Sequence, residues 1–308
     1  MKQDQAMERL LDAIRETFPH IALLEEEKMA AHCSFRTGGA VRALLLPGTE
    51  EELLTICTLC REAEVEPIIL GNGTNLVFPD ERSDRIVLGT EKIQDLYLTP
   101  EGEIFASCGV ALSRLASFAC ENALTGLEFA SGIPGTVGGG LLMNAGAYGG
   151  ELKDCVKNVR VLDKKSGKIS GFEKKDCDFS YRHSIFQNGE AVLLSARFSL
   201  TQGDKNRIRE EMKELNRRRR EKQPLEFPSA GSTFRRPEGH YAAALIEECG
   251  LKGRSIGGAK VSEKHAGFII NTGNATTEDL ASLIRVVQTE VYEQKQIALQ
   301  PEVIILQG

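Results

Sequence analysis

The stretch from residue 126 to residue 150 restricts the fold of this chain more than any other. It reads GLEFASGIPGTVGGGLLMNAGAYGG, and no ordinary helix or strand tolerates so much glycine, which adds backbone entropy and packs nothing. A glycine-rich backbone does allow N–H groups to approach an anionic ligand closely. Ile133, Val137 and residues 141–143 are apolar and interleaved with the glycines, which predicts a packed segment. We therefore expect a ligand cradle here, with a structural loop as the alternative.

A second glycine loop, GNGTNL at residues 71–76, follows a predicted strand, helix and strand. The strands are expected at 41–46 and 67–70, and the helix between them begins at a capping box formed by Thr49 and Glu52. The loop is not a Rossmann fingerprint, because the third glycine is missing and no helix follows. On its own it is either a site for a diphosphate or a plain turn.

Length and charge narrow the class of protein. The 308 residues predict two or three domains, and the net charge of −6 argues against a nucleic-acid partner. No apolar run reaches the roughly 18 residues of a membrane-spanning helix. Residues 1–17 form a charged amphipathic pattern and not a signal peptide, so we expect a cytoplasmic protein without a membrane span.

The eight cysteines predict no metal site, because none has the spacing of a paired ligand set. Cys57 and Cys60 form a C-x-x-C, but they lie within the helical pattern of residues 51–63. We expect two side chains buried on one helix face, with a redox couple as the alternative. Reduced thiols are expected throughout.

The remaining pattern predicts an α+β protein. Further strands are expected at 23–29, 86–88, 104–108, 156–162, 168–172, 191–200 and 302–306. Further helices are expected at 1–17, 112–122, 205–222, 242–249 and 276–294.

Several motifs in collinear order resemble the UDP-N-acetylenolpyruvoylglucosamine reductase (MurB) family. They are CSFRTGG at 33–39, the loop 71–76, the stretch 126–150, SYRHSIF at 180–186, AGSTF at 230–234 and LQPEV at 299–303. Two residues depart from the common pattern: Cys33 replaces Thr, and Gly140 replaces Ala. The short interval between Arg182 and Ser232 resembles the compact type, which lacks a tyrosine-bearing substrate-capping loop.

The resemblance implies a three-domain flavoprotein with the FAD-binding fold of the vanillyl-alcohol-oxidase/PCMH type. An N-terminal FAD-binding α/β subdomain is expected at 1–80, a second α+β FAD-binding subdomain at 81–202 and a substrate-binding α+β domain at 203–308. FAD is expected to bind noncovalently, because no histidine matches a covalent attachment site. The implied cofactor-binding residues are Arg36, Gly71, Asn72, Gly73, Thr74, Asn75, Leu76, Ser131, Gly132, Ile133, Pro134, Gly135, Thr136, Gly138, Gly139, Asn144, Ala145 and Gly146.

Three residues are carried over as catalytic. Arg182 would lie beside the substrate carboxylate, which a guanidinium binds through two parallel N–H bonds. Ser232 would give a proton to C2 of the enolpyruvyl group, and Glu302 would orient or polarise the enol. Taken alone, Arg182 reads as a surface ion pair, Ser232 as a turn or capping serine and Glu302 as an ordinary residue at a strand edge.

The substrate-binding residues are expected to include Tyr181, Arg235, Lys260, Lys264 and His265, and no metal ligand is predicted. The basic run 217–220 is either a solvated helix face or part of an anion funnel for a diphosphate or NADPH.

The implied activity is NADPH-dependent, FAD-mediated reduction of UDP-N-acetylglucosamine enolpyruvate to UDP-N-acetylmuramate, in peptidoglycan precursor synthesis. Hydride would reach C3 of the enolpyruvyl group from the reduced flavin, and the partners would be these small molecules. One alternative is a flavin-dependent oxidase of the same fold that acts on another alcohol or sugar. Another is a binding module for flavin or nucleotide sugar without turnover.

Overall fold

The computed structural model describes residues 2–307, with side chains from Gln5 onward. The chain forms two compact units, each assembled from separate stretches of sequence. Unit 1 comprises the chain up to residue 25 with 43–72 and 85–216; unit 2 comprises 26–42, 73–84 and 217–308. The division into three consecutive domains at 1–80, 81–202 and 203–308 stays a prediction.

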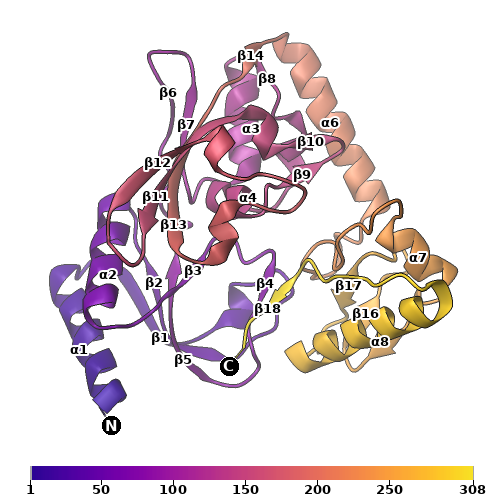
Figure 1. Ribbon diagram of the computed structural model, residues 1–308, viewed down its shortest axis with the longest axis horizontal. Helices are drawn as coiled ribbons and strands as arrows, with labels where there is room; N and C mark the ends of the chain where they lie inside the picture. The colour runs from indigo at the N-terminus through magenta and orange to yellow at the C-terminus, as the bar shows by residue number, and fades with distance from the viewer. Residues whose placement is uncertain (1, 308) are drawn as a thin grey trace. The chain divides into compact units, whose positions relative to one another are not determined.

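Unit 1 contains a helical layer on a short sheet, in which α1 (Lys2–Thr17) and α2 (Glu50–Glu62) lie side by side (Figure 1). The sheet has the order β1 (Ala22–Lys28), β2 (Ala40–Leu46), β5 (Ser83–Gly89) and β3 (Ile68–Leu70). Residues 26–28, 40–42 and 83–84 of these strands belong to unit 2. The buried apolar stripes of both helices share one core with the sheet, including Leu11, Ile14, Leu53, Ile56, Leu45 and Ile86.

A second, antiparallel sheet of unit 1 carries the glycine-rich stretch. Its strand order is β12 (Ile169–Glu173), β11 (Val156–Asp163), β13 (Ala191–Phe198), β7 (Ile104–Ser107) and β6 (Leu96–Leu98). Helix α4 (Val137–Leu142) packs on β13 and β7, and α3 (Leu112–Glu121) lies against α4 (Figure 1). Because Val137 and Leu141 are completely buried in this core, the glycines between them are held in a defined place.

Short elements complete unit 1. They are β8 (Leu124–Thr125) paired with β14 (Thr201–Gln202), β9 (Gly146–Ala147) paired with β10 (Gly150–Glu151), α5 (Leu152–Cys155), and the 3-10 turns η2 (Glu128–Gly132), η3 (Lys174–Asp176) and η4 (Ile185–Asn188). Helix α6 (Lys205–Lys222) begins in unit 1 and ends in unit 2.

Unit 2 packs two helices with short strands and includes the 3-10 turn η1 (Met29–Ala31), which follows the last residues of β1. Strands β15 (Ser255–Ile256), β16 (Ala259–Val261) and β17 (Ile269–Asn271) form an antiparallel sheet, and β4 (Leu76–Val77) pairs in parallel with β18 (Ile304–Ile305). Helices α7 (Ala242–Glu248) and α8 (Thr277–Lys295) contact each other. Their buried faces share a core with the strands that includes Ile246, Leu283, Val287, Val261, Val77 and Phe35.

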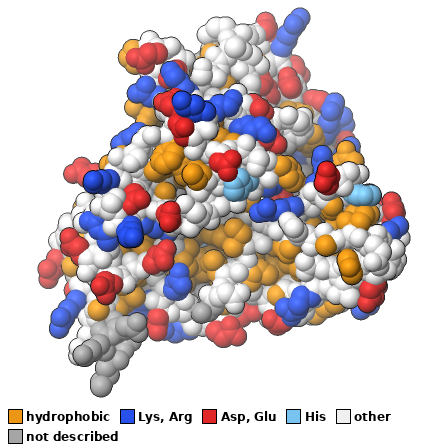
Figure 2. All heavy atoms as spheres, viewed as in Figure 1, with side chains coloured by type: hydrophobic (Ala, Val, Ile, Leu, Met, Phe, Trp, Pro, Cys, Tyr) orange, Lys and Arg blue, Asp and Glu red, His pale blue; other side chains and the backbone are white. Residues whose placement is uncertain are grey.

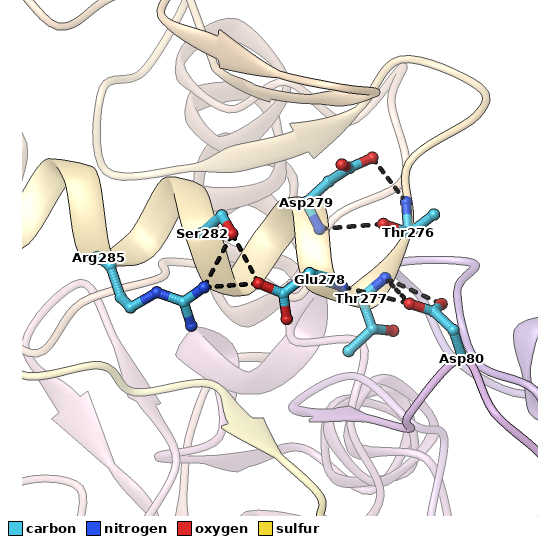
Figure 3. A network of polar contacts seen from close by, with 7 residues as sticks. All are labelled: Asp80, Thr276, Thr277, Glu278, Asp279, Ser282 and Arg285. Carbon is cyan, nitrogen blue, oxygen red and sulfur yellow. Dashed lines mark hydrogen bonds and ion pairs between the residues drawn. The ribbon is translucent and has the colours of Figure 1, made fainter.

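The first turn of α8 is held by side chains from two directions (Figure 3). Thr276 and Asp279 form a capping box, in which the Asp279 N–H donates to Thr276 Oγ1 at 3.0 Å. The carboxylate of Asp80 accepts from the N–H groups of Thr277, at 2.8 Å, and Glu278, at 3.3 Å. The chain segment that follows the 71–76 loop is thereby attached to α8.

Most predicted elements are present, and two expectations were wrong. The glycine-rich stretch contains the six-residue helix α4, although so much glycine argues against a helix. The last strand is only Ile304–Ile305, because residues 301 and 302 bind the 233–235 segment instead of continuing it. Cys60 is fully buried, Cys57 is partly buried against the same core, and all eight cysteines are free thiols.

The distribution of charged side chains on the surface agrees with the modest net charge of −6. On the face in Figure 2, lysine and arginine side chains are interspersed with aspartate and glutamate. Within residues 2–307, no helix has both the length and the apolar character needed to cross a membrane.

Candidate active site

The glycine-rich stretch is packed, as its interleaved apolar residues predict. Glu128 is 7% exposed and accepts hydrogen bonds from Thr125 Oγ1 at 2.6 Å and from the Gly126 N–H at 2.8 Å. At Gly140, a β-carbon would lie 2.8 Å from Leu152 Cδ1 and 3.1 Å from Leu112 Cδ1. Glycine at this position therefore serves close packing between α4 and its neighbours.

Within unit 1, the start of the 71–76 loop lies against residues 134–136. Asn72 Nδ2 donates to the Pro134 carbonyl at 2.8 Å, and a β-carbon on Gly71 would come within 2.5 Å of Thr136 Oγ1. Two stretches that are far apart in sequence are thus in contact, as expected for one ligand cradle.

Only part of the cradle backbone is available to a ligand. The N–H groups of Val137 and Gly138 donate to the carbonyls of Val110 and Cys108, both at 2.8 Å. The N–H groups of Asn72, Gly135 and Thr136 have no acceptor within residues 2–307. Unused donors on two loops that are in contact suit the oxygens of a diphosphate.

The rest of the loop, residues 73–76, is built into unit 2. Gly73 has a φ of +59°, and a β-carbon there would overlap the carbonyl oxygen of His32. The Gly73 carbonyl accepts from the Ser34 N–H at 3.0 Å, which joins this loop to the CSFRTGG motif. In that motif Arg36 is exposed at a φ of +60°, and burial raises the pKa of the Cys33 thiol to about 12.

Arg182 occupies a tight turn in unit 1. The backbones of Ser180 and His183 pair through two hydrogen bonds of 3.2 and 3.1 Å, and Arg182 between them has a φ of +53°. A non-glycine residue in this left-handed region costs on the order of 1–3 kcal/mol, so the surrounding structure must hold it there. Arg182 Nη2 donates to the Gly146 carbonyl at 3.0 Å, and the guanidinium lies 5.1 Å from the centre of the Tyr181 ring.

The Arg182 turn is attached to the end of the cradle. Ser184 Oγ donates to the Leu142 carbonyl at 2.7 Å, and Gln187 Nε2 donates to the carbonyls of Leu142 at 3.1 Å and Arg182 at 3.0 Å. The structure therefore brings one predicted catalytic residue to the glycine-rich stretch. Sequence reasoning missed Ser184 and Gln187 as supports. Ser184 lies within the SYRHSIF motif, which could have pointed to it, whereas no pattern marks Gln187.

Ser232 and Glu302 are brought together in unit 2. The Glu302 N–H donates to the carbonyl of Thr233 at 2.8 Å, and the Arg235 N–H donates to the carbonyl of Gln300 at 2.8 Å. Thr233 is itself fixed by its N–H, which donates to the Gly267 carbonyl at 2.8 Å, and by Oγ1, which accepts from Ile269. Ser232 is exposed at the edge of this buried pairing.

The segment that carries Glu302 also contacts the 73–76 loop, because Asn75 Nδ2 donates to the carbonyl of Glu302 at 3.1 Å. Three predicted site segments of unit 2 therefore converge on residues 233 and 302.

The predicted substrate-binding residues of unit 2 differ in their surroundings. Lys260 pairs with Glu263 at 3.0 Å, and Lys264 donates to the Arg220 carbonyl at 2.9 Å. Arg235 has a buried Nε without an acceptor in the described residues, which suits a site that receives an anion.

His265 is partly buried, and its Nδ1 accepts from the Gly267 N–H at 3.1 Å. Burial lowers the pKa of His265, so its imidazole favours the neutral form. The assignment of Tyr181, Arg235, Lys260, Lys264 and His265 to substrate binding stays a prediction.

A groove of about 540 Å³ lies elsewhere in unit 1, between the end of α2 and the turns around β11 and β13. It is lined by Cys57, Arg61, Glu66, Lys164 and Glu190 among others, and it shares no residue with the cradle. Within residues 2–307, no three His, Cys, Asp or Glu side chains are arranged to hold a metal ion.

Comparison with known proteins agrees with this geometry. Residues 41–172 match the model of an FAD binding domain, and residues 223–306 match the C-terminal domain of UDP-N-acetylenolpyruvoylglucosamine reductase. The reductase of that name from Caldanaerobacter subterraneus subsp. tengcongensis is 47% identical over 97% of this chain and 98% of the relative. The chain belongs to the UDP-N-acetylenolpyruvoylglucosamine reductase family. It is an FAD-dependent oxidoreductase.

Two further relatives support the assignment. The Exiguobacterium sibiricum reductase is 45% identical, with 97% of this chain and 98% of the relative covered. The crystal structure of the Thermus caldophilus reductase has a TM-score of 0.79 and 30% identity, with 94% of this chain and 99% of that chain covered. The predicted α+β flavoprotein fold is confirmed.

The cradle fits the cofactor. A dinucleotide carries a diphosphate, and the unused N–H groups of Asn72, Gly135 and Thr136 are donors of the kind that diphosphate oxygens need. Gly139 is exposed on the first turn of α4, where its backbone is open to a neighbouring ligand. The individual cofactor-binding residues remain predictions.

Proposed function

We propose that this reductase converts UDP-N-acetylglucosamine enolpyruvate to UDP-N-acetylmuramate with NADPH as electron donor, through the residues Arg182, Ser232 and Glu302. The observation that carries the proposal is the backbone pairing of Glu302 with Thr233, the residue next to Ser232. Family membership supports the reaction, and this pairing supports Ser232 as the proton donor with Glu302 as its acidic neighbour.

The cradle residues would hold FAD, with Asn72, Gly135 and Thr136 donating to the diphosphate. When bound, FAD supplies the transfer of reducing equivalents from NADPH to C3 of the enolpyruvyl double bond. The contribution of the protein is to position the substrate and to stabilise charge.

Arg182 is proposed to bind the carboxylate of the enolpyruvyl group. Its guanidinium donates to the Gly146 carbonyl and lies over the Tyr181 ring. Negative charge that develops on the substrate would be stabilised by this fixed cation.

Ser232 is proposed to donate the proton to C2. A hydroxyl is a weak acid, so the negative charge left on Oγ has to be stabilised by nearby cations. Arg235 is three residues away, and its buried Nε has no acceptor within the described residues. Glu302, on the paired segment, would orient the enol and assist the proton transfer.

The product would enter peptidoglycan precursor synthesis in the cytoplasm. A flavin oxidase of the same fold would need no proton donor at Ser232 and would consume oxygen. A binding module without turnover would leave NADPH unoxidised.

The test is product analysis by mass spectrometry after incubation of the FAD-loaded enzyme with NADPH and UDP-N-acetylglucosamine enolpyruvate. We expect a product with two more hydrogen atoms than the substrate, formed in proportion to the NADPH oxidised. Oxygen consumption with an unchanged enolpyruvyl substrate would support the oxidase, and no NADPH oxidation would support the binding module.

A further inference from the structure

The residue that follows the glycine-rich helix, Asn144, uses its side chain entirely within the protein. The side chain is 0% exposed, and its amide makes three hydrogen bonds. Nδ2 donates to the Ser180 carbonyl at 2.8 Å and to Glu151 Oε2 at 2.9 Å, and Oδ1 accepts from the Lys153 N–H at 2.9 Å. Both Nδ2 donors are used within the protein, and the one acceptor site left on Oδ1 belongs to a residue with no exposed surface.

The backbone at Asn144 does not require this side chain. Asn144 has a φ of +42° just after α4, where it ends the helix, and glycine occupies such positions readily. The Asn144 N–H donates to the Leu141 carbonyl at 3.2 Å, and the Ala145 N–H donates to the Gly140 carbonyl at 2.8 Å. Glycine would preserve both bonds, so the amide has a different purpose.

The role of the Asn144 amide is indicated by the carbonyl group to which it donates. The Ser180 carbonyl receives the His183 N–H at 3.1 Å and Asn144 Nδ2 at 2.8 Å, so the amide secures the first residue of the strained turn that carries Arg182. The other end of the turn is held by Ser184 and Gln187, through the Leu142 carbonyl. Arg182 Nη2 binds Gly146, two residues beyond Asn144.

We propose that Asn144 is a positioning residue for Arg182: it fixes the 180–183 turn to the end of the flavin cradle and thereby sets the place of the guanidinium. This inference rests on the proposed function, in which Arg182 binds the substrate carboxylate. It assigns the Asn144 side chain to the second half-reaction and not to cofactor binding.

The main test is Asn144→Gly, which removes the amide and keeps the left-handed backbone. We expect FAD to be retained and flavin reduction by NADPH to change little. Flavin reoxidation by UDP-N-acetylglucosamine enolpyruvate should slow by about 10²-fold, as for a catalytic group displaced by about 1 Å. Gln296→Gly is the matched control, because Gln296 ends α8 at a φ of +57° with an exposed side chain. It should leave both half-reactions unchanged.

A double-mutant cycle separates positioning from general damage. If Asn144 acts through Arg182, then Asn144→Gly should slow reoxidation little further in an Arg182→Ala background. The same fold-loss in both backgrounds, or equal slowing of both half-reactions by Asn144→Gly alone, would overturn the proposal.

Hydrogen exchange gives a readout that is independent of turnover. Asn144→Gly should accelerate amide exchange in a peptide covering 177–187 and leave residues 104–107 of β7 unchanged. Unchanged exchange in 177–187 would overturn the proposal. Failure of the wild-type enzyme to reoxidise its flavin with this substrate would instead contradict the proposed function, while the exchange result would still decide whether Asn144 holds the turn.

Discussion

The backbone N–H of Glu302 donates to the carbonyl of Thr233 at 2.8 Å, so residue 302 lies beside the residue that follows Ser232. Residues 233 and 302 lie far apart in sequence, within the last stretch of unit 2. Buried backbone pairing is a more rigid connection than contact between flexible side chains. The relative placement of the proposed proton donor and its acidic neighbour is therefore fixed by the fold.

Removal of the Ser232 hydroxyl should separate the two half-reactions. In Ser232→Ala, flavin reduction by NADPH should keep its wild-type rate, and reoxidation by the enolpyruvyl substrate should slow by roughly 10²–10⁴-fold. Stopped-flow absorbance of the flavin measures both steps. Ser255→Ala, in an exposed strand position of the same unit, should behave as wild type. Equal slowing of both steps by Ser232→Ala would exclude Ser232 as the proton donor.

Gly139 tests whether the backbone of α4 faces the flavin. A β-carbon there would meet only Thr136 Oγ1, at an ordinary 3.6 Å, so the protein itself has room for alanine. Alanine is also favoured over glycine in a helix by about 1 kcal/mol. Gly139→Ala should therefore keep or raise the stability of the apoprotein and weaken FAD binding by about tenfold or more, equivalent to about 1.4 kcal/mol. Unchanged affinity in a flavin titration would show that the ligand does not approach this face.

The Asp80 carboxylate should stabilise unit 2 through the first turn of α8. It accepts from the N–H groups of Thr277 and Glu278, so Asp80→Ala should lower the free energy of unfolding by about 1–2 kcal/mol. Chemical denaturation followed by circular dichroism suits this chain, which contains no tryptophan. Glu278→Ala removes an exposed ion pair with Arg285 and an exposed hydrogen bond from Ser282 Oγ, and it should have a smaller effect. An equal effect of the two variants would contradict the capping role of Asp80.

His265 should make stability depend on pH on the acidic side of neutrality. Burial holds its pKa below the ordinary value of 6.5, so the unfolded chain takes up a proton before the folded protein does. The free energy of unfolding should fall as the pH drops through 6.5 towards the folded-state pKa, and the contribution of His265 to the slope should vanish well above 6.5.

His265→Asn should flatten this part of the profile, measured by denaturation at pH 7.5 and 5.5 with saturating FAD. His240→Asn, at an exposed position, should keep the wild-type profile. A wild-type slope in His265→Asn would show that another group is responsible.

Local signals predicted the regular elements well. Thr49 with Glu52 gives the start of α2, and the charged pattern of 205–222 gives α6, because caps and helical periodicity are written in neighbouring residues. Helix α4 could not be predicted in this way. Its glycines disfavour a helix, and the buried side chains of Val137 and Leu141 and the hydrogen bond from the Val137 N–H to the Val110 carbonyl depend on the folded unit.

The motifs located the candidate site, but the residues that hold its side chains in place could not be predicted from the sequence. The sequence identified Arg182 by resemblance, whereas the amides of Asn144 and Gln187 reach the turn only because the chain has folded around it. The discontinuous units were also hidden, because β1, β2 and β5 each run from one unit into the other. Pairing between strands that are distant in sequence produces no local sequence pattern from which it could be predicted.

The central claim is that one flavin serves NADPH and the enolpyruvyl substrate in turn, and an anaerobic two-step mixing experiment tests it most directly. The FAD-loaded enzyme is first mixed with one equivalent of NADPH and then with UDP-N-acetylglucosamine enolpyruvate, while the flavin absorbance is followed. We predict bleaching after the first addition and rapid recovery of the colour after the second. Bleaching without recovery would contradict the assigned substrate, and a protein that cannot be loaded with FAD would contradict the cradle itself.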